Sequence, residues 1–202
     1  MDWGCSLCKR PCDQLLCREC NARLFSDFTL REEDGIYYGW HYEGLVSILM
    51  TAWKSGGNRN LSSVFVSALR RLLEALPAES SPHPGWMIIP IPCSRAGRRK
   101  RGFDQMADIA GLLEKADGNH FAAVHLLRRK CRPERFGGKN HDDTVDLFEL
   151  RKVGKADTLS RLGWKAILVD DIVVTGTSCV QARTLVAAQL HELPECVCLA
   201  GN

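Results

Sequence analysis

Two adjacent carboxylates, Asp170 and Asp171, stand between an apolar run and a short loop of small residues. The run 167–169 predicts a buried strand of a parallel sheet, since such strands are apolar on both faces. Strand, acidic pair, small-residue loop and helix form the layout of a phosphate site, in which backbone N–H groups and the helix dipole receive an anion. The loop contains Thr175, Gly176, Thr177 and Ser178, and the helix that follows has Cys179, Ala182, Leu185, Val186 and Leu190 on one face.

The acidic pair narrows the class of ligand. Carboxylates beside a phosphate cradle suit a ligand with vicinal hydroxyls or a Mg²⁺ ion, because Mg²⁺ prefers hard oxygen ligands and bridges to phosphates. The run 169–178 resembles the phosphoribosyl-pyrophosphate (PRPP) signature of type I phosphoribosyltransferases. A strand, turn and helix with a solvated aspartate pair is the simpler alternative. The glycine patterns of dinucleotide sites and P-loops do not occur in the sequence.

Four cysteines near the N-terminus have the spacing of a structural zinc site. Two Cys-x-x-Cys pairs can place four thiolates around one tetrahedral Zn²⁺. A redox motif would need a βαβ context that is missing, and a disulfide is disfavoured without a secretion signal. Residues 1–24 have few apolar side chains, so bound metal is expected to supply the folding free energy. The predicted ligands are Cys5, Cys8, Cys17 and Cys20, while Cys12 is either free or a competing ligand.

Strands and helices alternate from residue 86 onward, which predicts a parallel α/β sheet with helices on both faces and ligands at the carboxyl ends of its strands. Upstream, residues 36–43 predict a strand or hairpin, and two amphipathic helices follow around 45–53 and 61–76. The expected strands of the sheet are Met87–Pro92, Ala122–Leu127, Lys165–Val169 and Glu195–Ala200, with a helix at Phe103–Leu113. The expected domains are a zinc module at 1–24, a connecting region at 25–84 that could serve as a hood, and the α/β domain at 85–202.

Two basic segments follow the first two expected strands, so they should lie at the same edge of the sheet as the acidic pair. Either segment alone is typical of a solvated loop, but two beside a phosphate cradle predict a polyanion surface. The first contains Arg95, Arg98, Arg99, Lys100 and Arg101, and the second Arg128, Arg129, Lys130, Arg132 and Arg135. The aromatic residues Tyr37, Tyr38, Trp40 and Tyr42 could stack on nucleobases, although packing against the zinc module is the expected role.

The composition is that of an ordinary globular protein. The chain has 202 residues, of which 45% are hydrophobic and 25% charged, and a formal net charge of +3. No apolar run approaches the length of a membrane span, and the N-terminus lacks the apolar core of a signal peptide. We therefore expect a cytoplasmic chain with reduced thiols.

Taken in order, these parts resemble the ComF family of competence-associated, phosphoribosyltransferase-like proteins. Two further runs match that family, namely 89–92 and the Arg-Gly-Phe-Asp-Gln stretch at 101–105. The resemblance implies that 93–102 is the pyrophosphate loop and that 131–148 is a flexible lid. It also implies that the catalytic pair Asp170 and Asp171 holds the ribose hydroxyls and the metal, while Thr175–Ser178 cradles the 5-phosphate. The lid segment only approximates the family's usual Thr-x-x-Gln and Arg-x-x-Asn-Val elements.

The resemblance implies PRPP binding with Mg²⁺ in DNA uptake and, if the protein is an enzyme, phosphoribosyl transfer through an oxocarbenium-like state. In that reaction the protein would position the ligand and stabilise the departing pyrophosphate. Two other functions stay open. The basic segments could bind single-stranded DNA, and the zinc module could dock a helicase-like protein of DNA uptake.

Overall fold

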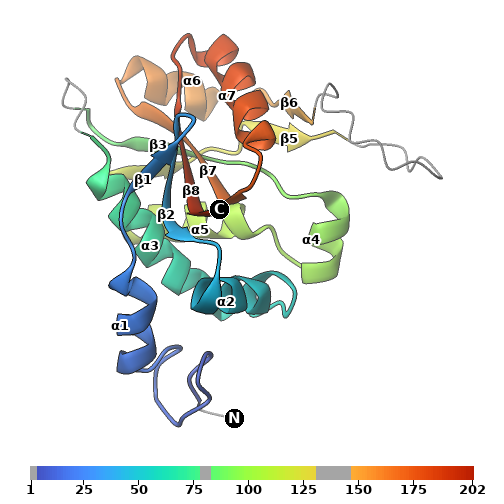
Figure 1. Ribbon diagram of the computed structural model, residues 1–202. Coiled ribbons are helices and arrows are strands. Elements are labelled where there is room, and N and C mark those ends of the chain that lie inside the picture. The colour runs from blue at the N-terminus through green and yellow to red at the C-terminus, as the bar shows by residue number, and fades with distance from the viewer. Residues whose placement is uncertain (1–3, 78–82, 131–146) are drawn as a thin grey trace.

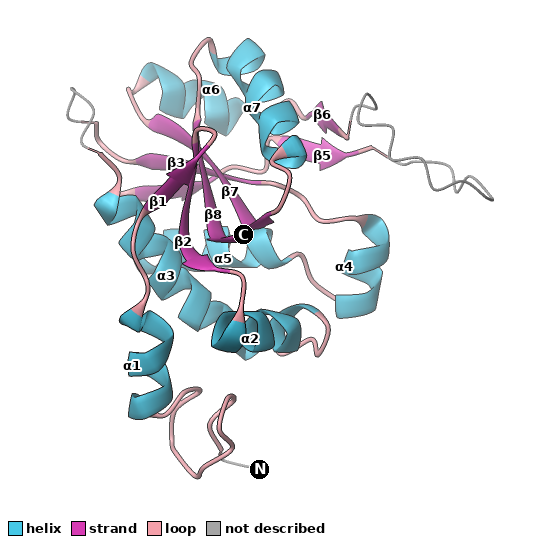
Figure 2. Cartoon of the chain, in the orientation of Figure 1, coloured by secondary structure: helices cyan, strands magenta, loops and turns pink. Residues whose placement is uncertain are grey.

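The computed structural model describes residues 4–77, 83–130 and 147–202 (Figure 1). Within these residues a six-stranded sheet lies between two helical layers (Figure 2). Its strands are β1 (Arg31–Glu33), β2 (Ile36–His41), β3 (Trp86–Pro90), β4 (Phe121–Ala123), β7 (Lys165–Val173) and β8 (Glu195–Gly201). The helices are α1 (Arg18–Ser26), α2 (Gly44–Lys54), α3 (Ser62–Ala75), α4 (Arg95–Arg101), α5 (Gln105–Ala116), α6 (Gly154–Arg161) and α7 (Thr177–Leu190), with a short 3-10 turn η1 (Arg59–Leu61).

The strand order is β1-β2-β8-β7-β3-β4, and every neighbouring pair except β1 and β2 is parallel. This confirms the predicted α/β sheet with helices on both faces. Strand β2 belongs to the connecting region in sequence, yet it pairs with β8 and extends the sheet at one edge. Nothing in the local pattern of residues 36–41 indicated that long-range pairing.

Strand β3 ends at Pro90, two residues before its expected end, and two other strands differ more from their expected limits. The strand expected at 122–127 is divided, because β4 ends at Ala123 and β5 (Leu127–Arg129) pairs with β6 (Phe148–Leu150) in a separate antiparallel sheet. Strand β7 continues to Val173, beyond the expected end at Val169, because its last residues pair with the end of β8. The acidic pair therefore lies within β7 and not after it.

The sheet buries a different core on each face. Helices α2, α3 and α5 pack with Ile167 and Val169 of β7, whereas α6 and α7 pack with Ala166 and Leu168. Side chains of a strand alternate between faces, so from Ala166 to Asp171 the odd-numbered positions of β7 face α2, α3 and α5, and the even-numbered positions face α7. The order is reversed at the end of the strand, where Ile172 packs with the first core and Val173 with the second. This alternation decides where each carboxylate of the acidic pair points.

The first basic segment forms α4 and is not a loop. The Ser94 hydroxyl oxygen accepts a hydrogen bond from the Gly97 N–H at 3.0 Å, which caps the start of the helix. Gly102 ends the helix in the left-handed conformation, with φ of 81°. These local signals outweigh the mutual repulsion of the five cations between Ser94 and Gly102.

The N-terminal segment packs onto the body of the protein. Leu16 and Leu24 are buried in the same core as Trp40, whose indole N–H donates to the Leu24 carbonyl at 2.7 Å. Phe25 and Phe28 lie against Trp40, with ring centroids 5.2 and 4.8 Å away. This confirms the packing role for Trp40 in place of base stacking. Among the described residues, no helix has both the length and the apolar character needed to span a membrane.

Candidate functional site

The two carboxylates of the acidic pair have different surroundings. Asp170 lies opposite Cys198 in the β7–β8 ladder, on the face covered by α7, and its Oδ1 accepts a hydrogen bond from the Asp171 N–H at 2.8 Å. Asp171 faces the other helical layer, where its Oδ2 lies 2.8 Å from Lys54 Nζ at the end of α2. Lys54 is therefore a residue of this site that the sequence pattern did not indicate.

The surroundings of Asp170 disfavour ionisation of its carboxyl group. Burial raises the pKa of Asp170 well above its usual range, and the negative charges of Asp171 and Cys179 raise it further. A bound cation, or hydroxyl groups donating hydrogen bonds to the carboxylate, would reverse this preference. A ligand that supplies a cation or hydroxyl groups would therefore favour the ionised form of Asp170.

The predicted phosphate cradle forms the start of α7. Gly176 is the N-cap residue and has φ of 69°, the left-handed conformation that favours glycine. No described side chain caps this helix, so the N–H groups of its first turn remain available to an anion. Thr175 and Thr177 bring their hydroxyl oxygens within 3.1 Å of each other. Beneath the loop lies Ile36 of β2, whose Cδ1 would be 3.1 Å from a Cβ added at position 176.

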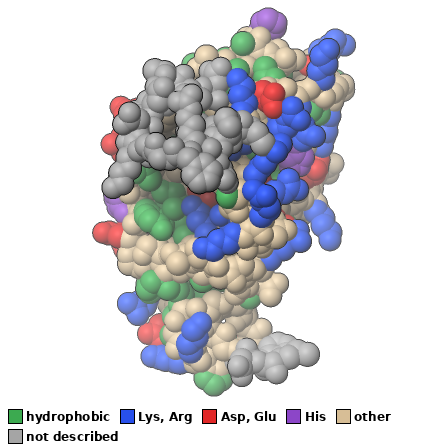
Figure 3. All heavy atoms as spheres, turned by 90° about the vertical axis from the view of Figure 1, so that its right-hand side faces the viewer, with side chains coloured by type: hydrophobic (Ala, Val, Ile, Leu, Met, Phe, Trp, Pro, Cys, Tyr) green, Lys and Arg blue, Asp and Glu red, His purple; other side chains and the backbone are tan. Residues whose placement is uncertain are grey.

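Cations of both basic segments line one cleft of about 820 Å³. Figure 3 shows Lys and Arg side chains gathered on this side of the molecule, which is the right-hand side of Figure 1. The cationic lining residues are Arg59, Arg95, Arg98, Arg128, Arg129 and Arg151, together with His125. Neither the acidic pair nor the Thr175–Ser178 cradle is among the described residues that line this cleft. The second-segment residues Arg132 and Arg135 lie outside the described residues.

The other cations of α4 have separate positions. Arg99 lines a smaller cavity of about 360 Å³ with Arg95 and Arg98, and Lys100 is exposed. Arg101 is half-buried, and a Cβ added at Gly97 would lie 2.7 Å from its guanidinium group. The first basic segment therefore points Arg95 and Arg98 toward the large cleft, whereas the Arg101 side chain lies against Gly97 of the same helix.

Asp104, within the 101–105 run, joins the end of β3 to the start of α5. Its Oδ2 accepts the Cys93 N–H at 3.2 Å, and its Oδ1 accepts the Ala107 N–H at 3.3 Å as a helix cap. Burial and the Asp104 charge together raise the pKa of the Cys93 thiol. In the wall of the cleft, Asp108 is paired with Arg59 through one oxygen, while its buried Oδ2 has no hydrogen-bond partner among the described residues.

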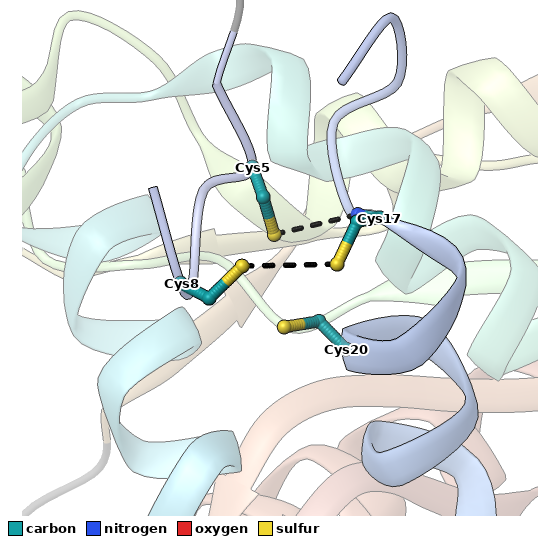
Figure 4. Close-up of side chains that lie close together, drawn as sticks. All are labelled: Cys5, Cys8, Cys17 and Cys20. Atoms are coloured by element: carbon teal, nitrogen blue, oxygen red, sulfur yellow. Dashed lines mark hydrogen bonds between the residues drawn. The ribbon is translucent and has the colours of Figure 1, made fainter. Parts of the chain in front are cut away.

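The four predicted zinc ligands converge on one point (Figure 4). Their sulfur atoms all lie within 4.8 Å of one another, and the Cys8 and Cys17 sulfurs are 3.7 Å apart. Cys17 precedes α1 and Cys20 lies in its first turn, so a helix start positions the second pair. The Cys12 thiol donates to the Gln14 carbonyl at 3.0 Å and is not part of the cluster.

Two thiols of this cluster have shifted pKa values, in opposite directions. Burial opposes ionisation of Cys5, but backbone N–H groups of Cys17, Cys8 and Leu7 lower its pKa to about 6. Burial and the neighbouring cysteines raise the pKa of Cys20 to about 12. Cys5 therefore ionises more easily than an ordinary thiol and Cys20 less easily, and a positive ion would favour the thiolate form of all four. The geometry and the donor set are compatible with structural Zn²⁺.

Comparison with known proteins shows similarity to a curated competence protein. The chain is 24% identical over 178 residues to "Competence protein ComFC" of Bacillus subtilis (strain 168), which covers 86% of this chain and 67% of the relative. This relative confirms the resemblance to the ComF family. No family model matches the chain.

The family resemblance assigns roles to two segments of the chain, 93–102 and 131–148. The segment likened to the pyrophosphate loop, 93–102, contains α4, whose Arg95 and Arg98 face the basic cleft. The segment likened to the lid, 131–148, lies outside the described residues except for its last two positions. Lys54, Arg59, Asp108 and Arg151 are candidate site residues that sequence reasoning missed. Their partners are distant in sequence, so no spacing could have identified them.

Proposed function

We propose that this chain binds PRPP, with Mg²⁺, at the junction of β7 and α7. The observation that carries the proposal is the start of α7, where the left-handed Gly176 leads into a helix N-terminus that no side chain of the described residues caps. Such a terminus suits a phosphate, because its N–H groups and dipole both favour an anion. The 5-phosphate would lie on the backbone of Thr175, Gly176, Thr177 and Ser178.

The acidic pair completes this proposal. Asp170 and Asp171 offer the hard oxygen donors that ribose hydroxyls and Mg²⁺ require. When bound, Mg²⁺ would neutralise charge on the pyrophosphate group of the ligand. The Lys54 Nζ lies 2.8 Å from Asp171 Oδ2, so Lys54 would either orient that carboxylate for the ligand or be displaced from it by the bound Mg²⁺. Phosphoribosyl transfer would additionally need an acceptor, and cations of α4 would stabilise the departing pyrophosphate.

A competence-related function is supported by the similarity to a protein named "Competence protein ComFC". Within that function, a second candidate activity is binding of single-stranded DNA. The cleft lined by cations of α4, β5 and η1 favours it, because phosphates of a nucleic acid are held mainly by such side chains. A helicase-like partner at the cysteine module remains a proposal that rests on the family resemblance.

Calorimetry separates the parts of the PRPP proposal. Wild-type protein is titrated with PRPP, ribose 5-phosphate and pyrophosphate, each with and without Mg²⁺. We expect PRPP to bind most tightly with Mg²⁺, and Asp171→Ala to weaken it by roughly 30-fold, the effect of one or two lost charge-assisted hydrogen bonds. A wild-type protein that binds none of the three at millimolar concentration would refute the proposal.

A further inference from the structure

A second group of cysteines lies on the opposite side of the sheet from the zinc module. Cys179 of α7 and Cys196 and Cys198 of β8 are at most 2% exposed. Their three sulfur atoms lie within 4.8 Å of one another. No disulfide joins these cysteines. Cys179 is distant in sequence from Cys196 and Cys198, so only the fold brings it to them.

The spacing of these sulfurs matches metal coordination. Two thiolates bound to one tetrahedral ion at about 2.3 Å are separated by about 3.8 Å. The Cys179 and Cys198 sulfurs are 3.7 Å apart, which is also the separation of Cys8 and Cys17 in the N-terminal cluster. Cys196 and Cys198 alternate with Val197 along β8, so both thiols face α7. Among the described residues, the site therefore consists of three sulfur donors.

A positive ion would allow the three buried thiols to ionise together. Three uncompensated thiolates cannot be buried together, whereas a divalent ion reduces their summed charge to about one negative unit. Cys179 is the third residue of α7, where the helix dipole favours negative charge. Asp170 lies opposite Cys198 in the ladder, but it is not part of the group whose ligand atoms lie within 4.8 Å of one another, so the three sulfurs alone define the site.

We propose that Cys179, Cys196 and Cys198 bind a second thiophilic divalent ion of the Zn²⁺ class. This inference is independent of PRPP binding. The ion would fasten the first turn of α7 to β8, and that turn follows directly on Gly176. It would thereby hold the N–H groups of the candidate phosphate cradle in a fixed position.

Metal counting by native mass spectrometry tests the proposal on the full chain, prepared with thiols reduced and Zn²⁺ present. We expect two ions per wild-type chain and one in Cys179→Ala. The double variant Cys17→Ser with Cys20→Ser should also retain one ion. Cys12→Ala, which removes a cysteine outside both clusters, should retain two. Cys196→Ala is a second variant that leaves α7 unaltered, in case Cys179→Ala does not fold.

Three results would overturn the inference. A wild-type chain that binds one ion after reconstitution would leave these cysteines as ordinary core residues. Two ions in both Cys179→Ala and Cys196→Ala would place the second ion elsewhere. A peptide in which Cys179 and Cys198 are joined, with loss of two hydrogens from the reduced protein, would identify a disulfide in place of a metal site.

Discussion

Replacing Gly176 with alanine tests whether the start of α7 binds an anion. The φ of 69° at this position costs an alanine about 1–2 kcal/mol. The new Cβ would also lie 3.1 Å from Ile36 Cδ1, and Ile36 is only 3% exposed, so its side chain has little room to move. We therefore expect Gly176→Ala to lower the free energy of unfolding by about 2–3 kcal/mol.

Gly163 provides a matched control at the other end of β7. Its φ is 80°, and a Cβ there would meet Pro84 at 4.0 Å, an ordinary contact. Gly163→Ala should therefore show the backbone cost alone, about 1–2 kcal/mol. Gly163 precedes the start of β7, so it is at the opposite edge of the sheet from the phosphate cradle.

The two variants separate stability from binding. Urea unfolding measures the first, and calorimetry with PRPP and Mg²⁺ measures the second at a temperature where both variants are folded. We expect Gly176→Ala to bind roughly 30-fold more weakly, because a shifted first turn loses one or two hydrogen bonds to the phosphate, and Gly163→Ala to bind as wild type does. Equal affinities in the two variants would refute a phosphate site at this terminus.

Three further predictions concern the other charged groups and the zinc module. Lys54→Met should lower the free energy of unfolding by about 1–2 kcal/mol in urea titrations, since it leaves the partly buried Asp171 unpaired, and adding Asp171→Asn should restore part of the loss. An additive double variant would contradict this pairing. Arg98→Glu should weaken binding of single-stranded DNA and reduce its salt slope by about one, and an unchanged slope would return Arg98 to a solvated surface. Removing zinc with a chelator should speed amide hydrogen exchange in α1 but not in β3. Exchange in α1 that is the same with and without the chelator would contradict a structural metal.

Local patterns predicted the elements that carry their own signals. The apolar run of β7, the glycine before α7 and the spaced cysteines are each visible within a few residues, and all three appear in the structure. Helix α4 also had local signals, a serine cap and a terminal glycine, but its run of cations was interpreted as a loop. Repulsion among the cations disfavours a helix there, but the Ser94 cap and the terminal Gly102 stabilise one.

Long-range contacts explain what the sequence could not predict. The pairing of β2 with β8, the contact of Lys54 with Asp171 and the meeting of Cys179 with Cys198 all join distant segments. Nothing in the spacing of these residues encodes such contacts. The extension of β7 has the same origin, because its last residues are strand only through their pairing with β8.

The contact between Lys54 and Asp171 links two regions that sequence analysis treated separately. Helix α2 belongs to the region expected to serve as a hood, and its last residue supplies a cation to the candidate ligand site. A Mg²⁺ ion at Asp171 would compete with that cation, whereas a phosphate group nearby would be attracted by it. Ligand binding at β7 is therefore expected to depend on where α2 ends, because the ligand must either displace Lys54 from Asp171 or use its charge.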